Sequence, residues 1–214
     1  MTQRGNSALD RQLERYYVRF TEDFWAFFRA EVEPLLPDAP VLADLGCGPG
    51  LYLRDVRVRL PEATLVGVDA GDDMLGHARS LMFEGAAPRF EKGDVTGTLP
   101  LADASVDLLT IAAVMHTLKD PFSFLKEVRR VLKPGGMFLL YDWVRVGFKE
   151  YIDLRISEPG DPEEARYPRA LELFSTHNKY TADDWRWIFD VASFGVVKEA
   201  WPFPRAIALL TRPQ

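Results

Sequence analysis

The sequence predicts an α/β fold, a doubly wound and largely parallel sheet with helices on both faces. Two observations lead to this prediction. Short apolar runs that end in an acid or a glycine turn, such as Val41–Leu45 and Thr64–Asp69, alternate with amphipathic segments of helical spacing. The glycine-rich turn Gly46–Gly50 then joins the first apolar run to an amphipathic segment. Strand, glycine turn and helix in this order form a ligand site at the carboxyl end of a parallel strand.

Length and composition set the outer limits of the interpretation. A chain of 214 residues is expected to form one domain, residues 1–214, that is large enough to bury a full sheet. The net charge of −6 argues against a nucleic-acid partner. No long apolar run predicts a membrane helix or a signal peptide, and the single cysteine, Cys47, fits a cytoplasmic protein.

The N-terminal segment is rich in aromatic residues at helical spacing. Residues 7–33 are expected to form one helix that Pro34 ends. These aromatic side chains either pack on the domain or form, within residues 1–36, a lid over the ligand with Tyr16 or Tyr17 facing it.

The glycine loop indicates which ligand binds. The string Asp44-Leu45-Gly46-Cys47-Gly48 continues to a third glycine as G-x-G-x-G, whereas a dinucleotide site requires G-x-G-x-x-G. An acid this close to the loop suits a ligand with a cationic amine better than a pyrophosphate. The segment resembles motif I of the class I S-adenosylmethionine (SAM)-dependent methyltransferases. That resemblance implies SAM as the cofactor, S-adenosylhomocysteine (SAH) as its product, and cofactor contacts from Asp44, Gly46, Cys47 and Gly48.

Further cofactor residues follow along the chain. Asp69 ends the second strand about 20 residues after the loop, where a carboxylate can accept hydrogen bonds from ribose hydroxyls. The run VDAGDDML resembles the second motif of the family, which implies that Ala70 and Met74 flank the adenosine. The resemblance also assigns Asp94 and Val95, after a short third strand within Pro88–Val95, to the adenine. The remaining residues that we assign to the cofactor are Ile111 and Tyr16.

Two more strings strengthen the resemblance. The segment Met115–Pro121 follows a fourth strand over Leu108–Val114 and resembles the "hHHh-DP" segment of the ubiquinone/menaquinone-type subgroup, although Thr117 replaces the second histidine. The turn LKPGG then leads from a helix into a fifth strand. The resemblance covers residues 40–145, the cofactor-binding core, and implies a Rossmann-like, seven-stranded sheet with a C-terminal antiparallel hairpin.

The rest of the chain is expected to cover and complete this core. Residues 146–180 break the pattern and are interpreted as a substrate-cover insertion. Residues 181–214 should form a helix capped by Thr181 and two final strands, Val196–Trp201 and Ala206–Thr211.

Methyl transfer needs alignment, exclusion of water and, for some acceptors, removal of a proton, but no nucleophilic side chain and no metal. His116 and His177 are the candidate catalytic residues because each falls near the expected active site. Tyr17, Tyr141, Trp143 and Tyr180 are the candidates that contact the substrate. The three histidines are too dispersed for a metal site.

The function that we expect is therefore methyl transfer from SAM to an O, N or C atom of a small, partly apolar or aromatic metabolite, by a monomer or a homodimer. Two alternatives stay open. The chain could use SAM for chemistry other than methyl transfer, or it could be a non-catalytic SAM-binding partner subunit.

Overall fold

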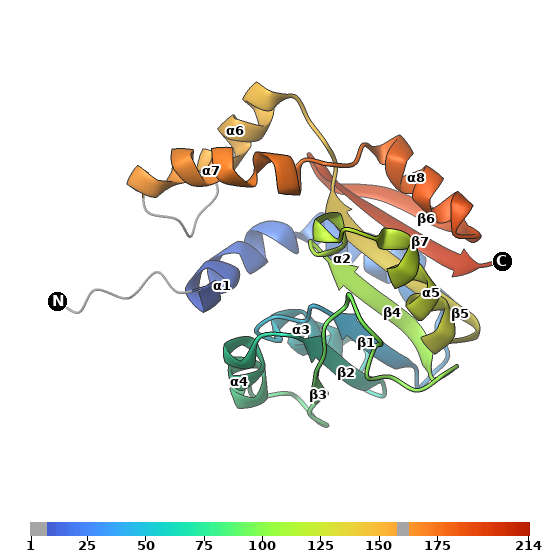
Figure 1. Ribbon diagram of the computed structural model, residues 1–214. Helices are drawn as coiled ribbons and strands as arrows, with labels where there is room; N and C mark the ends of the chain where they lie inside the picture. Colours follow the sequence, from blue (N-terminus) through green and yellow to red (C-terminus); the bar gives the residue numbers. More distant parts are fainter. Residues whose placement is uncertain (1–7, 158–162) are drawn as a thin grey trace.

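The computed structural model describes residues 8–157 and 163–214, which form a seven-stranded sheet with helices on both faces (Figure 1). The strands are β1 (Val41–Leu45), β2 (Thr64–Asp69), β3 (Arg89–Lys92), β4 (Val106–Ala112), β5 (Leu132–Trp143), β6 (Phe194–Phe203) and β7 (Ala206–Pro213). The helices are α1 (Ala8–Arg19), α2 (Glu22–Phe27), α3 (Leu51–Arg59), α4 (Asp72–Ser80), α5 (Pro121–Val131), α6 (Phe148–Ser157), α7 (Glu163–His177) and α8 (Ala182–Val191). Short π and 3₁₀ turns lie at Phe28–Val32, Glu33–Leu35 and Met115–Thr117.

The strand order β3-β2-β1-β4-β5-β7-β6 confirms the predicted fold class. Strands β1 to β5 are parallel, whereas β7 runs antiparallel to β5 and β6 antiparallel to β7. The chain winds outward from β1 in one direction and from β4 in the other. This reversal opens a crevice at the carboxyl ends of β1 and β4, where ligands bind in open α/β sheets.

Two apolar cores cover the two faces of the sheet. Residues of α1, α2, α3 and α4 pack on one face, and residues of α5 and α8 pack on the other. The parallel strands are buried on both sides and therefore consist of near-continuous apolar runs. The large buried area leaves the carboxyl edge of the sheet as a rigid base for a site.

The strand boundaries follow the expectation in part, since β4, β5 and β6 begin earlier than expected, at Val106, Leu132 and Phe194. Strands β1 and β2 begin and end at the expected residues. Strand β4 ends at Ala112, two residues earlier than expected, because Ala113 has a left-handed backbone with φ of 53°. A hydrogen bond of 2.9 Å from Ala113 N–H to the Tyr141 carbonyl holds this conformation, which turns the chain along the crevice.

The prediction of one helix over residues 7–33 is wrong. The chain leaves helical geometry at Thr21, whose φ of −74° and ψ of 170° are extended. The Thr21 hydroxyl caps α2 by accepting a hydrogen bond from Phe24 N–H, and Glu22 and Asp23 occupy the first turn. A threonine followed by two acids is a helix start signal, which the continuous aromatic spacing obscured. As a result α1 runs in its own direction over the carboxyl edge (Figure 1).

The cover consists of α6 and α7, which pack on each other through a small core of their own that includes Tyr151, Ile152 and Ala170. Figure 1 shows this helix pair beside α1 at one end of the sheet. Residues 1–7 of the expected lid and 158–162 of the expected cover lie outside the described residues. Within the described ranges, no helix has both the length and the apolar character needed to cross a membrane.

Candidate active site

The glycine loop after β1 is shaped by backbone hydrogen bonds to the neighbouring strand. Gly46 N–H and Cys47 N–H both donate to the Val68 carbonyl, at 2.8 and 3.0 Å. Gly46 has φ of +67°, and a Cβ built there would lie 2.7 Å from Val114 Cγ2. Only glycine satisfies both conditions, since a side chain would be strained and would collide with the segment after β4.

Asp69 connects this loop to the end of β2. Its Oδ2 accepts a hydrogen bond of 2.8 Å from Gly48 N–H, and its Oδ1 accepts one of 2.8 Å from Gly71 N–H. The two bonds fix the carboxylate at the edge of the crevice. Each oxygen keeps a second lone pair that can accept a ligand hydroxyl.

Asp44 is buried below the loop, where Thr110 Oγ1 donates a hydrogen bond of 2.7 Å to its Oδ1. Burial raises the pKa of Asp44 to about 7, and the charge of Asp69 acts in the same direction. The loop therefore lies beside two acids, the buried Asp44 and the Asp69 at the edge of the crevice. Such a site favours a ligand that carries positive charge.

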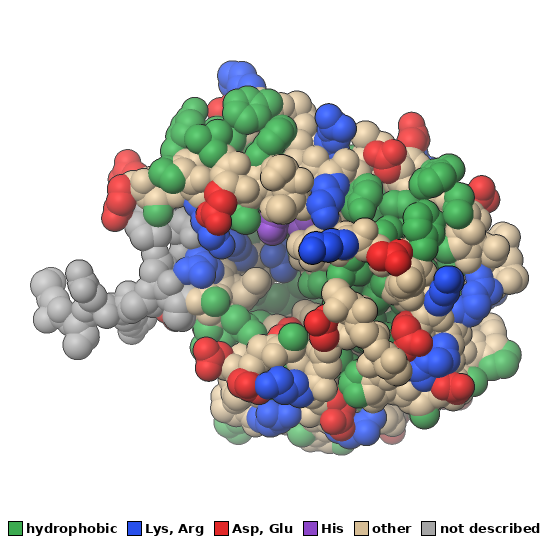
Figure 2. Space-filling model, in the orientation of Figure 1, with side chains coloured by type: hydrophobic (Ala, Val, Ile, Leu, Met, Phe, Trp, Pro, Cys, Tyr) green, Lys and Arg blue, Asp and Glu red, His purple; other side chains and the backbone are tan. Residues whose placement is uncertain are grey.

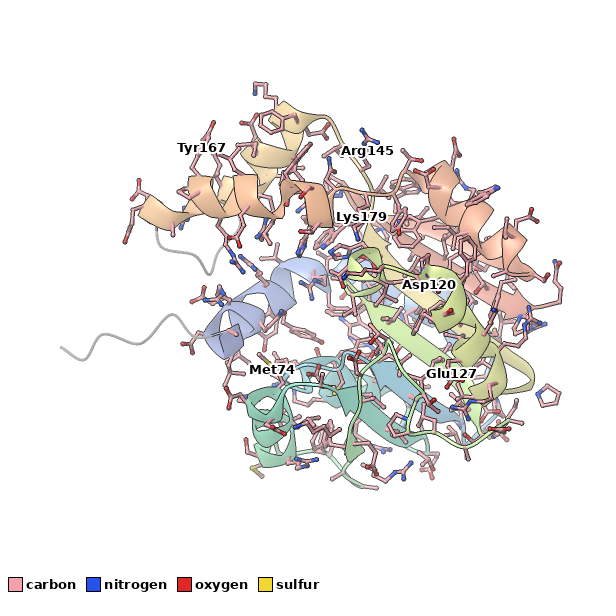
Figure 3. The ribbon with its side chains drawn as sticks, in the orientation of Figure 1. Met74, Asp120, Glu127, Arg145, Tyr167 and Lys179 are labelled. Atoms are coloured by element: carbon pink, nitrogen blue, oxygen red, sulfur yellow. The ribbon has the colours of Figure 1, made fainter. Side chains whose placement is uncertain are left out.

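A cavity of about 290 Å³ lies against the loop and the ends of β2, β3 and β4. Seven of the residues that we expected to bind the cofactor line it: Gly46, Gly48, Asp69, Ala70, Met74, Asp94 and Val95. Figure 3 shows Met74 at the end of α4 that faces α1. The Asp94 carboxylate accepts a hydrogen bond of 2.8 Å from Thr96 N–H, which lowers its pKa and keeps it ionised at the cavity wall.

A smaller recess of about 40 Å³ lies beside this cavity and contains three more of the expected residues, Tyr16, Asp44 and Cys47. The Tyr16 hydroxyl donates a hydrogen bond of 2.7 Å to Asp55 Oδ2, which ties α1 to α3. Burial raises the pKa of the Cys47 thiol, so this cysteine is a small wall residue and not a thiolate nucleophile.

Ile111 does not line the cavity. Its side chain is 1% exposed and packs in the core beneath α5 and α8. Ala112, Ala113 and Val114 line the cavity instead. They do so because the positive φ of Ala113 turns the chain at the point where the sequence predicted more strand.

The four residues expected to contact the substrate have different surroundings. Trp143 lines a second cavity beside the first. Tyr141 is buried, and its hydroxyl donates to the Arg19 carbonyl at 2.7 Å. Tyr180 packs on Trp185, outside the residues that line the cavities described here. Tyr17 is 64% exposed on the outer face of α1. The structure therefore brings only Trp143 of these four to a cavity wall.

The two candidate catalytic histidines lie in direct contact. His116 Nε2 is 3.0 Å from His177 Nδ1, although 61 residues separate them in sequence. His116 Nδ1 lies 2.6 Å from Asp142 Oδ1, and His116 N–H donates to Asp142 Oδ2. Asp142 also accepts a hydrogen bond from Trp143 N–H. The Asp142 carboxylate is buried and cannot donate, so the short contact with His116 favours a proton on Nδ1 of that ring.

This arrangement determines the state of His177. If His116 Nδ1 donates to Asp142, the neutral ring has an unprotonated Nε2, which accepts the hydrogen of His177 Nδ1. The other ring nitrogen of His177, Nε2, then carries a lone pair. Burial lowers the pKa of His177 to about 3, and the nearby charge of Arg155 acts in the same direction. His177 is therefore neutral at physiological pH.

His177 and Trp143 belong to the second cavity, which has a volume of about 240 Å³ and lies between α1 and the cover. It shares Gln12, Arg19 and Ala113 with the first cavity, so the two are neighbours across one wall. Five arginines line it: Arg11, Arg15, Arg19, Arg155 and Arg169. In Figure 2, Lys, Arg and His atoms gather around the hollow near the middle of the molecule.

The sequence did not lead us to these arginines or to Gln12, which lines both cavities. Arg11, Arg15 and Arg19 recur at every fourth position, which places them on one face of a helix. This spacing was the one signal that could have found them. Among the described residues, no group of three or more His, Cys, Asp or Glu side chains could hold a metal ion.

Comparisons with known proteins agree with the cofactor half of this site. Residues 43–140 match the family model described as methyltransferase domain. A trans-aconitate 2-methyltransferase from Azoarcus sp. (strain BH72) is 39% identical over 107 residues, which are 49% of this chain and 40% of that protein. The chain spans 33% to 40% of the length of three of the curated relatives that it matches.

Two solved structures resemble the whole fold. A SAM-dependent methyltransferase from Aquifex aeolicus has a TM-score of 0.69 at 18% identity, with 97% of each chain covered. The plantazolicin methyltransferase BpumL, solved with a desmethyl substrate analogue and SAH, has a TM-score of 0.72 at 15% identity, with 98% of this chain and 89% of that one covered. At these identities the likeness establishes the fold. The ubiquinone/menaquinone-type subgroup stays a prediction.

The match over residues 43–140 agrees with the fold and the glycine-loop cavity, and together they support SAM as the cofactor of this site.

Proposed function

We propose that this protein transfers the methyl group of SAM to an O, N or C atom of a small-molecule acceptor. One observation carries the proposal. The cavity at the glycine loop and the cavity that contains His177 share a wall, so a cofactor in the first would lie next to an acceptor in the second. Several matched relatives are named trans-aconitate 2-methyltransferase, which supports a small-molecule acceptor.

The residues at the glycine loop fit the cofactor. A Cβ added to Gly48 would meet no protein atom within 4 Å, so the loop leaves open space where a ligand can lie against the backbone. Asp69 and Asp94 line the cavity at this loop, and we expect Asp69 to accept hydrogen bonds from the ribose hydroxyls and Asp94 from the adenine amino group. Burial raises the pKa of Asp44, and the positive charge of a sulfonium or an ammonium group beside it would favour the carboxylate form.

Bound SAM supplies an activated methyl group: when the acceptor's lone pair attacks the methyl carbon, the carbon–sulfur bond breaks, its electron pair goes to sulfur, and SAH remains. The protein aligns the acceptor and excludes water. Where the acceptor atom carries a proton, His177 Nε2 is the group that takes it. The Nδ1 hydrogen of His177 then passes to His116 Nε2, 3.0 Å away, and the positive charge comes to rest beside the Asp142 carboxylate.

This sequence makes His177 the candidate catalytic residue and His116 and Asp142 positioning residues. It also resolves a difficulty, because an isolated imidazole with a pKa of about 3 is a weak base at neutral pH. Moving the proton to His116 places the charge next to a buried carboxylate and away from Arg155.

Calorimetric titration of SAM and SAH, with NAD as a control ligand, tests the cofactor site. The wild type should bind both sulfur compounds in a one-to-one ratio and should not bind NAD. Asp69→Ala should weaken binding roughly 30-fold or more, since it removes hydrogen bonds to a charged acceptor worth about 2 kcal/mol. Asp73→Ala, which removes an exposed acid in the first turn of α4, is the matched control and should bind as the wild type does.

The alternatives give different results. Absence of SAM and SAH binding, or binding of NAD, would overturn the proposal. With an acceptor found by screening, product formed without SAH would point to SAM-dependent chemistry other than methyl transfer. If the protein binds SAM but methylates no acceptor unless a protein partner is added, a non-catalytic SAM-binding partner subunit would be favoured.

A further inference from the structure

The second cavity is unusual in its charge. Arg11, Arg15 and Arg19 lie four residues apart on α1, so they share the face of that helix that turns toward the cavity. Arg155 comes from α6 and Arg169 from α7. Three separate helices therefore direct arginines to one space of about 240 Å³. Among the described residues that line it there is no acid.

The arginines lie close to the cavity and partly out of solvent. Arg155 is only 8% exposed, and Arg11, Arg15 and Arg19 are half-buried. Arg169 also pairs with Glu172 at 3.1 Å. The planar guanidinium fork carries several donors and matches carboxylate and phosphate oxygens in a bidentate geometry, so a wall of this composition suits an anionic ligand.

The cavity continues onto an aromatic surface that also faces cations. Trp143 lies in its wall, with the Arg19 guanidinium 5.7 Å from the ring centroid and the buried Arg205 guanidinium 4.5 Å from it. Stacking of this kind fixes the orientation of arginine side chains. Arg19 is therefore held against the ring, and the same cavity includes Ala113, which also lines the cofactor cavity.

We propose that this cavity holds an acceptor that carries two or more negative charges, as carboxylate or phosphate groups. The inference rests on the proposed function, since it names the substrate class of that site. It adds charged groups to the partly apolar or aromatic acceptor that the sequence led us to expect: the anionic groups lie among the arginines of α1, α6 and α7, and the rest of the molecule reaches past Ala113 toward the cofactor.

Calorimetry at low ionic strength tests the proposal with three probes: propane-1,2,3-tricarboxylate, inorganic phosphate and the neutral propane-1,2,3-tricarboxamide. Each is titrated into the protein with and without saturating SAH. At least one of the two anions should bind in a one-to-one ratio, and the triamide should not. The affinity should fall with added salt. Tricarboxylate binding alone indicates a carboxylate acceptor, and phosphate binding alone a phosphorylated one.

Variants assign the binding to this cavity. Arg15→Gln and Arg155→Gln should each weaken anion binding about tenfold or more. Arg29→Gln is the matched control, because that side chain is 59% exposed and pairs with Glu22 on the surface of α2, and it should bind as the wild type does. Circular dichroism checks the folding of Arg155→Gln, and the half-buried Arg15 provides a second variant that does not remove a buried side chain.

The inference fails if the triamide binds as well as the tricarboxylate, if neither anion binds, or if the Arg15 and Arg155 variants bind anions as tightly as the wild type does. These outcomes are distinct from failure of the proposed function. If the proposed function fails, SAH itself does not bind, whereas the anion titrations without SAH still show whether the second cavity binds anions.

Discussion

The two cavities that share a wall at the carboxyl edge of the sheet have opposite character. The cofactor half is acidic, with Asp44, Asp69 and Asp94 around the glycine loop, and strand ends and their short turns form most of its wall. The other half is basic, with arginines from α1, α6 and α7. The contrast shows how one crevice can attract a cationic cofactor and an anionic acceptor to adjacent positions without either occupying the site of the other.

We expect the largest difference between the two cavities in the kinetics of a His177 variant. If the basic half carries the chemistry and the acidic half only binds, His177→Ala should lower kcat by about 100-fold or more while SAH affinity stays within about twofold. Steady-state kinetics with an acceptor found by screening would measure this.

Added imidazole should restore part of the activity of His177→Ala, which a purely structural role would not explain. His116→Gln should produce a smaller loss, because it removes the group that accepts the proton second. A kcat for His177→Ala close to that of the wild type would contradict a base in the basic half.

The next effect concerns the shape of the acidic half. Gly46→Ala should lower the free energy of unfolding by about 2–4 kcal/mol, because it combines a left-handed backbone with overpacking against Val114. Gly48→Ala is the matched control: its φ of +53° gives a similar backbone strain, but its Cβ would meet no atom within 4 Å. Thermal and urea unfolding of the two variants compare these costs. An equal loss for both would show that the contact with Val114 does not shape the loop.

The smallest expected effect is on the pH dependence of the free energy of unfolding, to which the two cavities contribute with opposite sign. The folded pKa of Asp44 is raised to about 7, so the folded state binds a proton more tightly than the unfolded chain and loses stability as pH rises from about 4 to 7. His177 acts in the opposite direction: its folded pKa is lowered, so its contribution is lost as pH falls from about 6.5 toward 3. Asp44→Asn should remove the first slope and leave the second, as urea unfolding over this pH range would show.

A cationic ligand beside Asp44 should also lower the pKa of that carboxyl group. SAM binding near pH 7 should then release up to about half a proton, measured by calorimetry in buffers of different ionisation enthalpy. SAH lacks the sulfonium charge and should release less. Proton release that persists in Asp44→Asn would assign it to another group.

The two halves also differ in how far the sequence predicted them. The loop from Asp44 to Gly48 and the acid Asp69 are close in sequence, and hydrogen bonds between adjacent strands place them. Short sequence motifs were therefore enough to predict the loop and Asp69. Ile111 was misplaced because strand β4 ends earlier than its apolar run indicates, and a single residue of positive φ is not visible in an apolar pattern.

The basic half depends on tertiary contacts that sequence patterns do not report. His116 and His177 were predicted individually, but their contact across 61 residues and the buried Asp142 beneath them arise only when the cover folds onto the sheet edge. In the same way, the change of direction at Thr21 brings the arginines of α1 toward Arg155 and Arg169.

The division of the site along the chain has a consequence for evolution. Every arginine of the basic half lies outside residues 43–140, the region that matches the methyltransferase domain. Mutations in α1, α6 and α7 can therefore change the charge of the acceptor cavity while the glycine loop and its acids are inherited unaltered. Lineages that share this core can diverge in substrate by exchanging three peripheral helices, and the arginine pattern on α1 is the trait by which chains of this specificity could be sorted from their relatives.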